Sequence, residues 1–86
     1  MNGLTREDLN DVFEQAVNDG SRCMFVEITA EGVREVICIP RAWFNEKLEF
    51  YNRTYTDELR HIMNKRVMIT SLSHGGPDQL EQLIYN

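Results

Sequence analysis

The residues of this chain that could carry out chemistry are few and scattered. Metal binding would have to draw on two cysteines and two histidines, Cys23, Cys38, His61 and His74. Structural zinc sites place such ligands in pairs only a few residues apart. These four side chains follow none of those spacings, so we expect neither a metal site nor a bound cofactor.

Nucleophilic catalysis needs a Cys or Ser side chain beside a base that a third group orients. Cys23 with His61, or Ser71 and Ser73 with His74, could supply the first two groups if the fold brought them together. The chain contains no Gly-x-Ser-x-Gly elbow, no phosphate-binding loop and no paired-carboxylate pattern. We therefore expect a protein that is not an enzyme, and a hydrolase that uses His74 is the distant alternative.

The charge distribution restricts the partners. The chain holds 14 acidic and 9 basic side chains, and its net charge is -5 at pH 7. All of that excess lies in the part that ends at Glu35, which argues against this half binding phosphate backbones or an anionic bilayer. The neutral second half mixes basic and aromatic residues, as single-stranded nucleic-acid binders do. Acidic residues at helical spacing from these basic residues would neutralise part of their positive charge. The basic residues of this alternative function are Arg53, Arg60, Lys65 and Arg66.

No segment resembles a membrane span or a secretion signal. A span needs about 18 apolar residues without charges, and a signal needs a basic start followed by an apolar run; Met1–Asp8 has neither. We therefore expect a cytosolic protein that does not enter membranes. Cys23 and Cys38 are expected to be reduced, buried thiols, because a disulfide framework is typical of secreted chains with more cysteines.

The first half of the chain predicts a helix followed by a β-hairpin. Thr5 and Asp8 match a capping box, and Gly20 is placed to end the helix. Cys23–Thr29 and Val33–Ile39 are then predicted to form two antiparallel strands, joined by a three-residue loop that ends in a glycine. The helix side opposite its apolar residues would be acidic and could dock on a basic partner, although a solvated face is the simpler interpretation. Its residues are Glu7, Asp11 and Glu14.

A regular apolar stripe predicts one long helix in the middle of the chain. Its members recur every three or four residues without a register slip: Phe44, Leu48, Tyr51, Tyr55, Leu59 and Ile62. Pro40 suits the first turn, and a kink or break is open only near residues 52–56. Residues 67–72 predict a third strand, and a short helix after Pro77 would complete the chain. Gly75 and Gly76 before that helix are a turn or, less simply, an anion site.

Several apolar residues lie off this stripe and exceed what one sheet face needs to cover its core. Trp43 and Phe50 are seven residues apart on one side of the helix, and we single them out as a broad core contact or a partner interface. The last predicted helix adds a second apolar face, made of Leu80, Leu83 and Ile84.

The stretch from Ile39 to Leu59 resembles a pattern in small uncharacterised proteins of phages and prophages of Gram-positive bacteria. In that pattern a strand ends in an apolar residue and Pro and leads into a helix with a Lys-Leu-Glu-aromatic-Tyr run and then a Tyr-x-Asp-acid-Leu run, as Lys47 to Tyr51 and Tyr55 to Leu59 do here. The resemblance implies an origin. It implies no activity.

These observations predict one α+β domain over residues 1–86, in the order helix, strand, strand, helix, strand, helix, with a three-stranded antiparallel sheet covered mainly on one face. The leading hypothesis for its function is a non-catalytic protein-interaction module that binds a protein partner or a second copy of itself. Under this hypothesis the partner would bind the two aromatic residues off the stripe, the apolar face of the last helix and the acidic face of the first helix.

Overall fold

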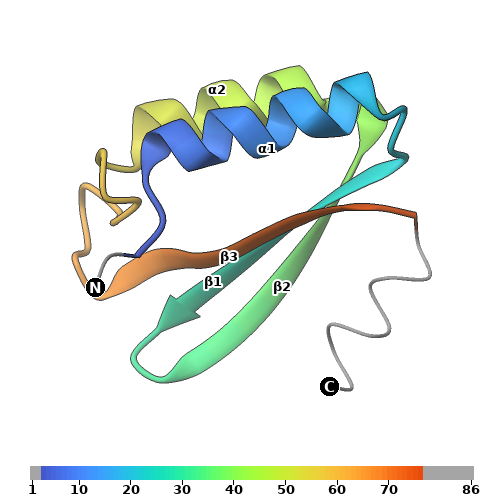
Figure 1. The fold of residues 1–86 in the computed structure, drawn as a ribbon. Helices are drawn as coiled ribbons and strands as arrows, with labels where there is room; N and C mark the ends of the chain where they lie inside the picture. Colours follow the sequence, from blue (N-terminus) through green and yellow to red (C-terminus); the bar gives the residue numbers. More distant parts are fainter. Residues whose placement is uncertain (1–2, 77–86) are drawn as a thin grey trace.

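The computed structural model of the chain describes residues 3–76 and shows two layers over them (Figure 1). One layer is an antiparallel sheet of three strands, β1 (Cys23–Ala30), β2 (Val33–Pro40) and β3 (Val67–Gly75), with β1 in the centre. The other layer is the helix pair α1 (Arg6–Asn18) and α2 (Phe44–Thr54), which runs side by side over one face of that sheet. The predicted α+β class and three-stranded antiparallel sheet are confirmed. The predicted last helix, with Leu80, Leu83 and Ile84, lies outside the described residues.

Helix α1 begins at the predicted capping box. The Thr5 hydroxyl accepts a hydrogen bond from the Asp8 amide at 3.3 Å, and the Asp8 carboxylate accepts one from the Thr5 amide at 2.9 Å. These two bonds satisfy backbone donors that the first turn of a helix cannot pair internally. The helix ends at Asn18, two residues before Gly20, whose φ of 71° suits a residue without a side chain.

The hairpin turn is shorter than predicted. Ala30 already pairs with Val33, so the turn contains only Glu31 and Gly32 rather than three residues. Their φ angles are 52° and 84°. Two successive positive φ values define the type I′ turn, whose twist matches that of the two strands it joins. The prediction missed it because Glu31 is not a residue that typically adopts a positive φ.

The prediction of one long helix from Phe44 to Ile62 is wrong, and the helix ends within residues 52–56, where the sequence left a break open. Arg41–Trp43 forms a 3-10 turn, and α2 ends at Thr54, where Tyr55 takes an extended conformation with φ of -116° and ψ of 151°. The Thr56 hydroxyl then accepts hydrogen bonds from the amides of Glu58 and Arg60 at 3.3 and 3.2 Å. This side-chain turn offers the backbone an alternative to continuing the helix.

The segment after α2 folds back against the end of the sheet. Its Leu59 is fully buried, with φ of 60°, and the Leu59 carbonyl accepts a hydrogen bond from the Ile69 amide at 2.9 Å. The His61 amide donates to the Val67 carbonyl at 2.8 Å. The segment therefore covers the outer edge of β3 over its first residues. Ile62, the last member of the predicted stripe, is exposed.

The core lies between the helices and the sheet. All the remaining members of the predicted stripe are buried in it, except that Leu48 is only partly buried. Phe13 of α1 and Phe44 of α2 meet edge to face, with ring centroids 5.8 Å apart. The sheet contributes alternate residues from its helix-facing side, as the predicted period of two requires. The buried core residues are Leu9, Phe13, Ala16, Met24, Val26, Ile39, Phe44, Tyr51, Tyr55, Leu59 and Ile69. Neither described helix is long and apolar enough to cross a bilayer.

Candidate interaction site

Trp43 and Phe50 stay largely outside the core. Their side chains are 51% and 41% exposed, which are high values for aromatic residues of this size. The ammonium group of Lys47 lies over the Phe50 ring, 5.5 Å from its centroid. Lys47 and Phe50 recur at helical spacing on α2. Trp43 lies directly before them, at the N-cap of α2 and the end of the 3-10 turn. We call this surface the α2 outer flank (Trp43, Lys47 and Phe50).

The opposite side of α2 faces α1. The Asn52 side-chain amide donates to the Asn10 carbonyl oxygen of α1 at 2.9 Å, and Asn45 and Leu48 line a groove shared with α1. Residues 45 and 52 are about half a helical turn away from residues 43 and 50, so the outer flank points away from α1. Helix α1 packs over β3 and α2 over β2. The α2 outer flank therefore overhangs the β2 side of the sheet.

The groove between the helices has an apolar floor and an acidic rim. Its volume is about 280 Å³, and Phe13, Phe44 and Leu48 lie at its base. Asp11 and Glu14 of the predicted acidic face stand at its margin, while Glu7 belongs to a separate hollow at the start of α1. The predicted acidic residues thus remain exposed, but they belong to two neighbouring surfaces.

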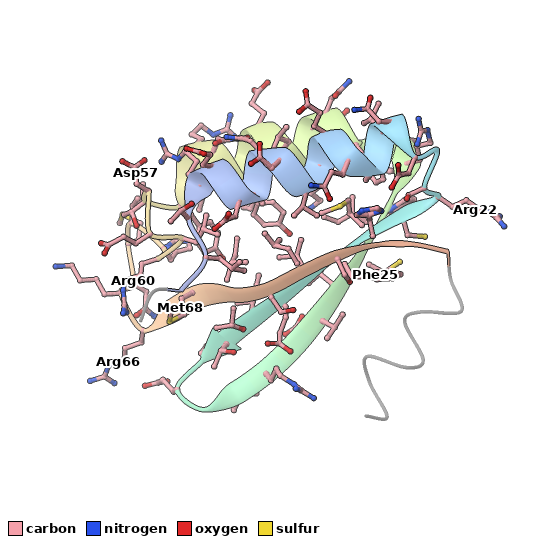
Figure 2. The ribbon with its side chains drawn as sticks, in the orientation of Figure 1. Arg22, Phe25, Asp57, Arg60, Arg66 and Met68 are labelled. Atoms are coloured by element: carbon pink, nitrogen blue, oxygen red, sulfur yellow. The ribbon has the colours of Figure 1, made fainter. Side chains whose placement is uncertain are left out.

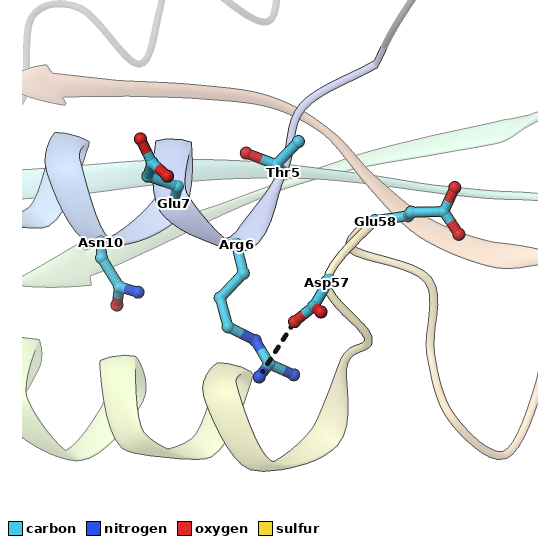
Figure 3. Close-up of a pocket in the computed structure, with 6 residues that line it drawn as sticks. All are labelled: Thr5, Arg6, Glu7, Asn10, Asp57 and Glu58. Carbon is cyan, nitrogen blue, oxygen red and sulfur yellow. Dashed lines mark ion pairs between the residues drawn. The ribbon is translucent and has the colours of Figure 1, made fainter.

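The hollow at the start of α1 is built around Arg6 (Figure 3). Its guanidinium forms an ion pair with Asp57 at 3.2 Å and donates to the Tyr55 carbonyl at 2.6 Å, while its backbone amide donates to the Asp57 carbonyl at 2.8 Å. The Arg6 Nε is buried without a hydrogen-bond partner. These bonds hold the segment after α2 against α1, so Arg6 has a structural role.

Ser21, His74 and Asp19 form a contact that no sequence spacing predicted. The Ser21 hydroxyl lies 2.8 Å from His74 Nδ1, and His74 Nε2 lies 3.9 Å from an Asp19 carboxylate oxygen. The predicted partners Ser71 and Ser73 lie on the opposite face of β3 from His74, because side chains alternate along the regular register from Ser71 to His74. Cys23 and His61 lie at opposite ends of the sheet, because His61 bonds to Val67 and Cys23 pairs with Gly75.

The Ser21 contact lacks what acyl-transfer chemistry needs. An oxyanion must be met by backbone amides that point at it. Here the amides of Asp19, Gly20, Ser21 and Arg22 all donate to backbone carbonyls, at distances of 2.8 to 3.2 Å. The 3.9 Å separation from Asp19 is also too long for a hydrogen bond that would orient the imidazole. The contact therefore ties the α1–β1 connection to β3.

The cysteines differ from the prediction in one respect. Cys23 is buried as predicted, whereas Cys38 is exposed; it lies on edge strand β2, on the face opposite α1 and α2. Although the residue is exposed overall, desolvation of its thiol and then the neighbouring Cys23 thiol raise the pKa of Cys38 above its ordinary value. A higher pKa leaves less thiolate at neutral pH, so Cys38 is a poor nucleophile. Within residues 3–76, no three His, Cys, Asp or Glu side chains converge where a metal ion could bind.

The basic residues of the alternative function do not form one uniform patch. Arg60 and Arg66 lie at the same end of the molecule, but Asp57 lies there too (Figure 2). Arg66 forms an ion pair with Glu31 at 2.7 Å, and Arg53 forms one with Glu49 at 3.5 Å. Acidic side chains therefore neutralise two of the four cations locally.

Comparison with known proteins adds no relative. No protein-family model, no curated protein and no solved structure matches the chain. The argument for function therefore depends on the surfaces described above. Of the residues predicted to bind a partner, Trp43 and Phe50 are both exposed.

Proposed function

We propose that this chain is a non-catalytic protein-interaction module, that it binds its protein partner through the α2 outer flank, and that it is an accessory protein of phage or prophage origin. One observation carries the binding role. Two large aromatic side chains are exposed, Phe50 on α2 and Trp43 on the 3-10 turn directly before it.

The chemistry of the flank supports this role. Aromatic side chains dominate the well-packed centres of protein interfaces, because they bury a large apolar area at a small cost in conformational entropy. Lys47, whose ammonium lies over the Phe50 ring, adds a charge that a carboxylate of the partner can meet. The origin rests on the resemblance of residues 39–59 alone.

Site-specific photo-crosslinking tests the binding role. A photoreactive phenylalanine analogue is placed at position 50 and, as the matched control, at Met63, which is 83% exposed but lies outside the flank. We expect position 50 to give a discrete protein adduct in the cells that express the chain and position 63 to give none. Mass spectrometry of the adduct separates a second copy from another protein. Equal labelling at both positions, or no adduct at position 50, would refute the proposal.

A further inference from the structure

Strand β2 presents a long edge to solvent. The segment Leu59–His61 covers the start of the β3 edge, whereas nothing within residues 3–76 pairs with the far side of β2. Most of β2 is exposed, including Val33 at 68%. Proteins usually protect such an edge with charged side chains, above all lysine, with proline or with a bulge inside the strand. Strand β2 contains the charged Arg34 and Glu35 but no lysine, its only proline is its last residue, and its pairing with β1 has no bulge.

The register identifies the backbone groups that point outward. Cys23 of β1 lies opposite Pro40 of β2. The Arg41 amide, one residue after Pro40, donates to the Arg22 carbonyl, one residue before Cys23, at 2.9 Å. A bond in this position means that Cys23 and Pro40 are a non-hydrogen-bonded pair. Because such pairs alternate along an antiparallel ladder, Val33, Glu35, Ile37 and Ile39 direct their backbone groups toward β1. The intervening residues direct theirs to the open edge. They are Arg34, Val36 and Cys38.

We infer that the partner is a second copy of this chain, paired antiparallel through β2 about a two-fold axis. This inference rests on the proposed function and names the partner of the same surface. Regularly spaced N–H and C=O groups along an edge are matched by another extended strand. Since the two copies present the same edge, a two-fold axis satisfies both edges at once and closes the assembly at a dimer.

The α2 outer flank fits this arrangement. The two sheets would join into six strands, and the two α2 helices would lie side by side on the same face, running in opposite directions. Trp43 of one protomer would then face Phe50 of the other. The two Lys47 side chains would approach the axis, where the exposed Glu35, on the helix-facing side of β2, supplies the opposite charge. One strand edge and one helix flank from each copy would bury a small interface, so we expect a dimer with a dissociation constant in the micromolar range, about 1 to 100 μM.

Amide hydrogen exchange on the full chain tests the edge directly. At about 1 μM protein, the amides of Glu35 and Ile37 should exchange slowly and those of Arg34, Val36 and Cys38 rapidly. At about 1 mM protein, the latter three should slow by at least about fivefold while sedimentation reports the mass of a dimer. A chain that remains monomeric, or a dimer in which these three amides stay unprotected, would overturn the inference.

A pair of variants at one position adds a second test. Val36→Pro removes an outward N–H and leaves the bonds to β1, whereas Val36→Thr keeps that N–H and the β-branched shape. We expect the proline variant to be monomeric and the threonine variant to dimerise; dimerisation of a folded proline variant would count against the edge. If Val36→Pro fails to fold, exchange on the wild-type chain decides. If the chain stays monomeric and position 50 crosslinks to another protein, the inference that the partner is a second copy is refuted. The proposed function is then still supported.

Discussion

Alkaline conditions should destabilise this fold through Tyr51. The Tyr51 side chain is buried in the core beside Tyr55, with ring centroids 5.8 Å apart. Burial, and then the neighbouring Tyr55, raise the pKa of Tyr51 to about 12 from an ordinary value of 10. Because the charged form is the disfavoured one, the folded state keeps its phenol proton at a pH where the unfolded chain has lost it. The stabilising difference is complete below pH 10 and is lost as the pH rises through 12.

The magnitude follows from the two pKa values. One pKa unit corresponds to about 1.4 kcal/mol, so Tyr51 should lower the free energy of unfolding by about 1 kcal/mol at about pH 11 and by about 2 kcal/mol at about pH 12, with a limit near 3 kcal/mol. Tyr51→Phe removes the titrating group and keeps the ring. We expect the variant to retain that free energy, so its advantage over the wild type should grow from pH 9 to pH 12, roughly as this calculation gives.

Urea denaturation at a series of pH values measures this difference, with the ionisation of the tyrosines followed by ultraviolet absorbance in parallel. Tyr55→Phe is the matched variant, because burial also raises the pKa of Tyr55 and should give the same sign. If wild type and Tyr51→Phe lost stability in parallel over that range, Tyr51 would not titrate from a buried position, and the description of the core would be wrong.

Three further outcomes are expected. Glu31→Asn should raise the unfolding midpoint by about 2 to 4 °C, because relief of the positive φ at Glu31 gains about 1 kcal/mol and the exposed ion pair to Arg66 is worth only about 0.5 kcal/mol; a lower midpoint in a thermal scan would contradict this. Phe13→Ala should cost about 3 to 5 kcal/mol in urea denaturation, since Phe13 is buried against Phe44, and a loss below about 2 kcal/mol would be inconsistent with that packing. The chain should not bind a single-stranded DNA oligonucleotide at about 50 mM salt, because ion pairs occupy Arg53 and Arg66; fluorescence anisotropy would detect binding, and a steep salt dependence would favour the alternative function.

Local signals in the sequence predict most of the fold. The capping box at Thr5 and Asp8 is a short-range pattern, and short-range hydrogen bonds form it in the structure. The hairpin follows equally from two β-rich runs around a glycine. The three-stranded sheet could be predicted because each strand has its own apolar run. The order β2-β1-β3 depends on how the chain returns after α2, which no local pattern specifies.

The error over residues 55–62 has a clear physical cause. Burial at a spacing of three or four residues is required by a helix but is not unique to one. Tyr55 and Leu59 are buried because their segment folds back against β3, and hydrogen bonds to Thr56 and Ile69 fix that path. The positive φ of Leu59 is unusual for such a residue, so its type could not reveal the turn.

The sequence predicted only part of the candidate site. The position of Trp43 and Phe50 off the core stripe singled them out as a broad core contact or a partner interface, and the structure shows both side chains exposed. The open edge of β2 and the contact between Ser21 and His74 could not be predicted, because each depends on elements that are far apart in the sequence.

The environment of Trp43 tests the central claim most directly, because it is the only tryptophan of the chain. Labelling with 5-fluorotryptophan gives one fluorine resonance, whose shift between H₂O and D₂O reports solvent contact. We predict a large solvent shift in dilute purified protein and a small one at high concentration or in an extract of the expressing cells, where a partner buries the α2 outer flank. A resonance that keeps the full solvent shift under all of these conditions would contradict the account.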